Sequence, residues 1–231
     1  VDYPRKYLER FAFLFVLIMV SLGVYYSRTD LQYYEGVYAR EDGLIEWLTV
    51  IALLTGAILN IYRANILKPF RNRKFIFGLY VLALVFLFGM MEEISYGQRI
   101  WEAWFDFKVP AFFLKYNSQG EMNLHNLRFG GVKINKLIFG TFLGICVVFY
   151  FLILPFLYRK KEGIKNLVDS WALPIPKIYH IVAYICLEIA AEAIAGGKKG
   201  EILDFGGCWI FLIMIFEPFN REIFSRKCFE R

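Results

Sequence analysis

The sequence predicts an all-α fold: a polytopic integral membrane helical bundle with about six transmembrane helices, in a single domain over residues 1–231. Two observations lead to this prediction. The chain of 231 residues is 58% hydrophobic and 19% aromatic, and only 21% of its residues are charged, which is not the composition of a soluble domain. Its apolar residues also gather in long runs separated by short clusters of Lys and Arg, as in helices that cross a bilayer.

A helix needs about 20 apolar residues to cross a hydrocarbon core roughly 30 Å thick. The runs that approach this length are residues 8–26, 43–62, 75–91, 137–157, 178–196 and 202–216. The first four are nearly free of charge. The last two are weaker, because one contains Glu188 and Glu192 and the other is short and includes Asp204. It therefore stays open whether one of them is tilted or crosses only in part.

The basic residues predict how these helices are oriented. The segments on the side of the two termini hold 17 Lys and Arg, and those on the other side hold 10. Because cytoplasmic loops have the excess, we expect both termini in the cytoplasm and the loop 99–136 outside, in a prokaryotic inner membrane. The net charge of +6 is spread over short clusters, which argues against a nucleic-acid partner.

A polar string follows the third apolar run. It contains Glu92 and Glu93, then Ser95, Gln98 and Arg99. If the helix continued, Glu92, Ser95 and Arg99 would share one face. Adjacent carboxylates near a low-dielectric boundary favour a general acid or base, so we interpret Glu92 and Glu93 as catalytic. Ser95, Gln98 and Arg99 are interpreted as substrate-binding residues, with Arg99 facing an anionic head group. The alternative is an interfacial Glu–Arg cluster that only ends the helix.

A second polar string lies in the loop that follows. Glu121 and His125 are four residues apart and would share a face of a helix, and we interpret both as catalytic. A hydrogen-bonded loop histidine is the equally weighted alternative for His125. Imidazole and carboxylates can also bind a divalent metal, so a metal cofactor stays open. The amides interpreted as substrate-binding are Asn117, Gln119, Asn123 and Asn126.

Carboxylates near two other runs complete the set. Asp42 is predicted to be the N-cap of the helix that begins near residue 43, and Glu46 lies one turn inside, at the same boundary as Glu92. We interpret Glu46 as substrate-binding. In the fifth run, Glu188 and Glu192 are one turn apart on one face, with His180 two turns earlier. This spacing suggests proton sharing or a metal ion.

Three strings resemble the motifs of a family of uncharacterised prokaryotic polytopic membrane proteins: Glu41-Asp42-Gly43 with Glu46-Trp47, Glu92 to Arg99, and Asn117 to Asn126. The resemblance implies a shared site and names no reaction. A weaker similarity is to intramembrane proteases of the CAAX-processing type, which combine E-E-x-x-x-R with histidines on other spans. Here five residues separate Glu93 from Arg99, and F-x-x-x-H is missing, so no catalytic role is transferred.

These residues leave functions of different classes open. The first is a membrane-embedded hydrolase or transferase, with a membrane lipid or lipid-linked substrate as partner, acting at the extracytoplasmic face. Acidic residues on several spans also suit a proton- or cation-coupled transporter. A structural subunit of an envelope complex would use the same polar residues to join helices or subunits, and a homo-oligomer stays open. Bound metal or lipid, ion flux and a stable partner would distinguish the three.

Overall fold

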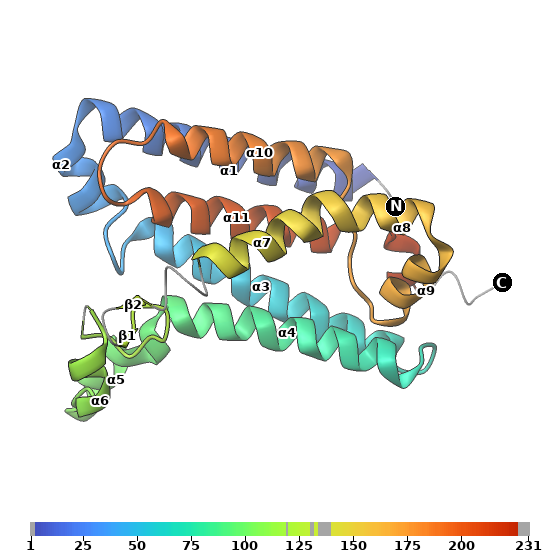
Figure 1. Ribbon diagram of the computed structural model, residues 1–231, viewed down its shortest axis with the longest axis horizontal. Helices are drawn as coiled ribbons and strands as arrows, with labels where there is room; N and C mark the ends of the chain where they lie inside the picture. The colour runs from blue at the N-terminus through green and yellow to red at the C-terminus, as the bar shows by residue number, and fades with distance from the viewer. Residues whose placement is uncertain (1–2, 119, 130–131, 134–139, 226–231) are drawn as a thin grey trace.

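The computed structural model describes residues 3–118, 120–129, 132–133 and 140–225, and they form a bundle of helices, as the all-α prediction requires. Successive long helices run in opposite directions, so α1 begins and α11 ends at the same end, which we call the termini end (Figure 1). We call the opposite end the loop end. The bundle consists of α1 (Tyr3–Thr29), α3 (Leu44–Leu67), α4 (Arg73–Glu93), the continuous series α7 (Leu143–Val148), η4 (Phe149–Ile153) and α8 (Leu154–Lys160), then α10 (Ile178–Glu192) and α11 (Lys199–Phe216).

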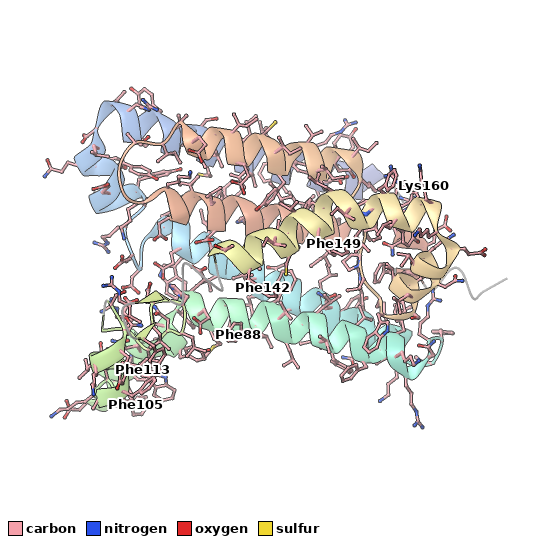
Figure 2. The ribbon with its side chains drawn as sticks, in the orientation of Figure 1. Phe88, Phe105, Phe113, Phe142, Phe149 and Lys160 are labelled. Atoms are coloured by element: carbon pink, nitrogen blue, oxygen red, sulfur yellow. The ribbon has the colours of Figure 1, made fainter. Side chains whose placement is uncertain are left out.

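Four helices among the described residues are long and apolar enough to cross a membrane: Tyr7–Thr29, Leu44–Leu67, Arg73–Glu93 and Gly140–Lys160. They correspond to the first four predicted spans, although the expected start of the fourth, residue 137, lies outside the described residues. Phe88, Phe142 and Phe149 on these helices are 43%, 63% and 45% exposed (Figure 2). Exposed phenyl rings in such number are suited to contact with lipid and not with water.

The last two predicted spans differ from the prediction. α10 ends at Glu192 and not at residue 196, so its 15 residues reach only about 22 Å. α11 has 18 residues, but charged side chains occupy its first turns. By length and composition, only four of the described helices could cross a membrane. The expected count of about six spans is therefore not confirmed. α11 packs against α1, α3 and α10 and fully buries Phe205 and Ile210. A helix enclosed by others can keep polar groups away from lipid.

The loop end contains short elements where a long loop was predicted between residues 99 and 136. The two strands pair antiparallel, with Phe129 opposite Val132, and this hairpin is a small exception to the all-α prediction. Phe105 and Phe113 lie on the two helices that extend beyond α4 (Figure 2). The elements in and around this predicted loop are α5 (Gln98–Phe105), α6 (Ala111–Tyr116), β1 (Arg128–Phe129) and β2 (Val132–Lys133). Two further short elements, α2 (Leu31–Tyr33) and η1 (Tyr34–Tyr38), follow α1 at the same end.

The termini end is closed by side chains that satisfy backbone groups. Arg63 on α3 donates to the carbonyl of Ile215 at 2.7 Å, which pairs one of the last carbonyls of α11. Asn220 donates to the Asp169 carboxylate at 3.0 Å and so joins the chain after α11 to the chain after α8. The short elements here are α9 (Glu162–Ser170) and η5 (Arg221–Phe224).

Candidate functional site

A left-handed turn follows α4 and shapes the site. Ser95, Tyr96 and Gly97 all have positive φ, at 46°, 55° and 75°. Left-handed backbone costs about 1 kcal/mol or more for each residue that is not glycine, and such strain gathers at functional sites. The predicted shared helical face of Glu92, Ser95 and Arg99 does not exist, because α4 ends at Glu93 and the chain turns away.

Glu92 and His125 form the central contact of the site. Oε2 of Glu92 accepts the backbone N–H groups of Leu124 and His125 at 2.9 and 3.0 Å, and Nδ1 of His125 lies 3.1 Å from the same oxygen. Glu92 is only 5% exposed, and its Oε1 is buried without a hydrogen bond to any described residue. A carboxylate beside Nδ1 favours the tautomer with its proton on Nδ1, so Nε2 is the basic nitrogen.

The turn also places Tyr96 next to this contact. Burial raises the pKa of Tyr96 above its ordinary value of 10.0, and the neighbouring Glu92 carboxylate raises it further. The phenol is therefore neutral at physiological pH and can donate a proton to a hydrogen bond. Sequence reasoning did not select Tyr96, because nothing in its type or spacing distinguishes it from the other fourteen tyrosines of the chain.

Three of the amides predicted to bind substrate make hydrogen bonds within or to the loop 117–126. Nδ2 of Asn117 donates to Oδ1 of Asn123 at 2.9 Å, and Oδ1 of Asn117 accepts the Glu121 N–H at 3.2 Å. Oε1 of Gln98 accepts the Met122 N–H at 2.8 Å. All three amides are buried. Their described contacts fix the backbone that presents Glu121 and His125.

The other two predicted amides are Asn126 and Gln119. Asn126 accepts the Ser118 N–H at 2.9 Å through its backbone carbonyl, which closes the loop on itself. Gln119 lies outside the described residues. Its predicted role in substrate binding therefore stays a prediction.

A line of polar contacts connects this loop to α3. Nδ2 of Asn123 donates to Oγ of Ser95 at 3.1 Å and to Oε2 of Glu121 at 2.7 Å. Arg99 then bridges two carboxylates, Glu121 at 3.3 Å and Asp42 at 2.9 Å. The Arg99 side chain is 54% exposed, so it can reach a ligand from this position.

The role predicted for Asp42 was wrong. The N-cap of α3 is Gly43, and Asp42 has a positive φ of 57° and pairs with Arg99. Oε2 of Glu46 accepts the Asp42 N–H at 2.6 Å and stabilises the turn. A Cβ on Gly43 would lie 2.5 Å from the Arg40 carbonyl oxygen, so the turn requires glycine.

Glu93 faces a different part of the bundle from Glu92. It lies within electrostatic range of Asp204, Glu201 and Glu46, which come from α11 and α3. Asp204 is in turn within range of His125. The sequence signal for Asp204 is a single carboxylate inside an apolar run, which by itself indicates only a weaker span.

Glu188 and Glu192 lie one turn apart on α10, but Glu192 and His180 have partners at opposite ends of the bundle. Glu192 forms an ion pair with Lys199 at the loop end. His180 is fully buried at the termini end, where its Nδ1 accepts the Lys177 N–H at 3.1 Å and its Nε2 lies 3.6 Å from Glu9. Within the described ranges, no three His, Cys, Asp or Glu side chains converge as metal ligands.

No family model matches the chain, and no curated protein or solved structure is significantly similar to it. The fold and contacts define a helical protein with four helices suited to a membrane. Its polar side chains gather where α3, α4 and the loop 117–126 meet. What this cluster does must therefore be argued from its chemistry.

Proposed function

We propose that the protein is a membrane-embedded hydrolase or transferase that acts on a lipid or lipid-linked substrate at the loop end. The observation that most supports this function is the contact between Glu92 and His125. A buried carboxylate that holds Nδ1 prepares Nε2 of the imidazole for general base catalysis. Glu92 thus acts as a positioning residue, and His125 is the proposed catalytic residue.

The proton transfers of this reaction balance on His125 alone. Nε2 takes the proton of a water, or of an alcohol in a transferase, while that oxygen bonds to the carbonyl carbon or phosphorus of the substrate. The imidazolium then gives the same proton to the leaving oxygen as its bond to the substrate breaks. Glu92, 3.1 Å from Nδ1, stabilises the transient positive charge.

The side chains around the site support a substrate that is held in a membrane. Trp101, Trp104 and Phe105 on α5 are 47%, 80% and 68% exposed, and Phe112 on α6 is 48% exposed. Indole and phenyl rings favour the head-group layer of a bilayer. A substrate with its chain in lipid and its reactive bond at that depth would meet His125 without leaving the membrane.

The proposal includes the orientation of the chain. We place both termini in the cytoplasm and the loop end on the extracytoplasmic side of a prokaryotic inner membrane, with α10 and α11 crossing beside the four longer helices. The 17 basic residues on the side of the termini, against 10 on the other, support this orientation. The central position of α11 supports its crossing despite its charges.

Proton or cation translocation is a second candidate function. One observation favours it: Glu93 lies within electrostatic range of carboxylates on two other helices, Glu46 and Asp204, and His125 lies within range of Asp204. Acidic groups on several helices are typical of proton relays. pH-dependent flux into vesicles that contain the protein would favour this function over the enzyme.

The enzyme proposal is tested with purified protein in vesicles made from bacterial lipid extract. Lipid products are followed by mass spectrometry for the wild type, His125→Ala and His180→Ala, which removes the other histidine from the opposite end. We expect new lipid products from the wild type and from His180→Ala, and at least a hundredfold less from His125→Ala, as for loss of a general base. Equal turnover by folded His125→Ala protein would refute the assigned role.

A further inference from the structure

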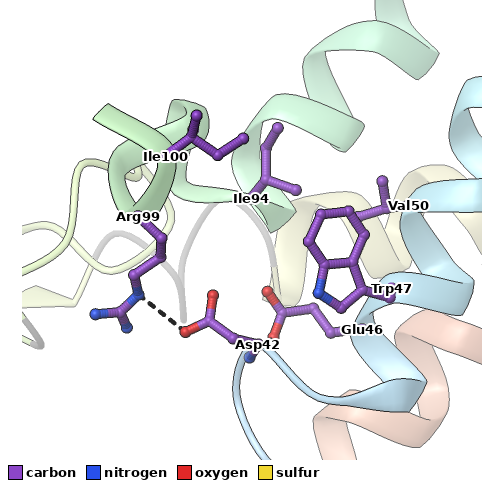
Figure 3. A pocket seen from close by; sticks show the side chains of 8 residues that line it. Asp42, Glu46, Trp47, Val50, Ile94, Arg99 and Ile100 are labelled. Carbon is purple, nitrogen blue, oxygen red and sulfur yellow. Dashed lines mark hydrogen bonds and ion pairs between the residues drawn. The ribbon is translucent and has the colours of Figure 1, made fainter. Parts of the chain in front are cut away.

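A small open cavity of about 30 Å³ lies between the start of α3 and the turn from α4 to α5 (Figure 3). Its charged side chains come from the Asp42 turn, α3 and α5, and its apolar side chains lie next to them. The residues that line it are Asp42, Glu46, Trp47, Val50, Ile94, Gly97, Arg99 and Ile100.

One wall of this cavity contains charges of both signs. The Asp42 carboxylate lies 2.9 Å from Nε of Arg99, and the Glu46 carboxylate lies next to Asp42 (Figure 3). Glu46 accepts the Asp42 N–H through Oε2, and its Oε1 accepts no hydrogen bond from the described residues. Arg99 uses Nε and Nη2 for its two carboxylate partners, and no described residue accepts from Nη1, whose donors point to a place for a ligand.

The other wall is apolar and open toward the outside of the bundle. Trp47 is 50% exposed and Ile100 is 52% exposed, while Val50 is buried between them and the helix core. Trp47 and Val50 belong to a helix suited to cross the membrane, near its loop-end start. A hydrocarbon chain that lies in the bilayer can therefore pack on this wall while its polar head reaches the charged wall.

We propose that this cavity binds a phospholipid whose head group has a primary ammonium. The ammonium donates to Asp42 and Glu46 beside the Trp47 ring, the phosphate accepts from Nη1 of Arg99, and an acyl chain packs on Trp47 and Ile100. Each charge of the head group thus meets a charge of opposite sign on the wall, and the ammonium also lies beside an aromatic ring.

This chemistry favours an ethanolamine-type head group over the other common head groups. An anionic head without an amine would bring negative charge toward two carboxylates with only one guanidinium present. A trimethylammonium group has no N–H to donate and is bulkier than –NH₃⁺, so Glu46 would lose water without gaining a hydrogen bond. The binding needs only the cavity, and it is measured independently of the hydrolase or transferase activity.

The test is competition for delipidated protein in detergent, read by native mass spectrometry. Dioleoyl phosphatidylethanolamine, phosphatidylcholine and phosphatidylglycerol are supplied at equal concentration. We expect wild-type protein to retain the ethanolamine lipid about fivefold over each of the others, as a charge-assisted hydrogen bond allows. Equal retention of all three lipids would mean non-selective contact with the membrane and would overturn the proposal.

Two variants locate the site. Glu46→Gln removes the charge, but its amide oxygen can still accept the Asp42 N–H, so the turn is preserved. We expect it to lose the preference for the ethanolamine lipid. Trp47→Ala removes an exposed ring and should lower retention of all three lipids. Glu192→Gln, at a carboxylate outside the cavity with a 75% exposed side chain, is the matched control and should behave as the wild type. An unchanged preference in folded Glu46→Gln would place the binding elsewhere.

Discussion

Glu92 and His125 lie 33 positions apart in the sequence, and they meet with Oε2 and Nδ1 3.1 Å apart. The contact joins the last turn of α4 to the loop 117–126. Two backbone N–H groups of that loop donate to the same carboxylate oxygen. A buried carboxylate is stable only with such donors, so this contact has a structural role as well as the proposed chemical one.

Removing the carboxylate should therefore destabilise the loop end. We expect Glu92→Ala to lower the free energy of unfolding by about 3 kcal/mol, because it leaves two N–H groups and an imidazole without their acceptor. Chemical unfolding in detergent measures the change. Glu192→Ala, with a 75% exposed side chain, is the control and should change stability by less than about 0.5 kcal/mol. Equal losses in the two variants would contradict the described contact.

Gly78 tests the packing of α4 at the termini end. A Cβ at this position would lie 2.0 Å from the carbonyl oxygen of Trp171, which is backbone and cannot rotate away. Gly78→Ala should therefore cost about 2 kcal/mol or more and lower the midpoint of thermal unfolding. Gly144→Ala meets nothing within 4 Å and should leave the midpoint unchanged or slightly raised. A stable Gly78→Ala protein would mean that α4 and Trp171 are farther apart than described.

Glu217, which follows α11, predicts how stability depends on pH. Burial alone would raise its pKa, but hydrogen bonds from Arg221 and Lys177 outweigh burial and hold the pKa below its usual 4.5. Since the pKa is lower in the folded state, ionised Glu217 stabilises the fold above about pH 4.5, and this stabilisation is lost as the pH falls through the folded pKa. The midpoint of thermal unfolding should fall less on acidification for Glu217→Gln than for the wild type. Identical pH profiles would show that Glu217 contributes nothing.

The proposed orientation is tested at Ser118, an exposed residue of the loop end. A single cysteine is introduced by Ser118→Cys in a chain without its four native cysteines. In intact cells a membrane-impermeant thiol reagent should label it from outside. A cysteine that reacts only after the cells are opened would place the loop end in the cytoplasm and reverse the proposed topology.

The membrane helices were predictable because a helix that crosses a bilayer needs an apolar run as long as the hydrocarbon core is thick. The runs at residues 8–26, 43–62 and 75–91 correspond to α1, α3 and α4 because lipid requires long apolar segments there. α10 ends at Glu192, before the predicted end at residue 196. The apolar run that led to the prediction continues through Ile194, but the chain is no longer helical there. Apolar composition therefore located the helices better than it located their ends.

The sequence predicted which residues belong to the candidate site better than it predicted how they are arranged. The polar strings that contain Glu92, Glu121 and His125 do meet. Their geometry depends on a left-handed turn at Ser95 and Tyr96, and residues of these types rarely adopt positive φ, so no local pattern indicates it. Glu92 and Glu93 were expected about 100° apart because they are adjacent in a helix. The carboxylates that Glu93 approaches depend on the position of α11, which the string does not indicate.

The tautomers of the two histidines test the central claim most directly. Nδ1 of His125 lies against the Glu92 carboxylate, whereas Nδ1 of His180 accepts the Lys177 N–H at 3.1 Å. The ¹⁵N NMR spectrum of histidine-labelled protein, at a pH where both rings are neutral, should therefore show one ring protonated at Nδ1 and one at Nε2, with the Nδ1–H signals missing from His125→Ala. A His125 ring protonated at Nε2 would contradict its assignment as a base oriented by Glu92.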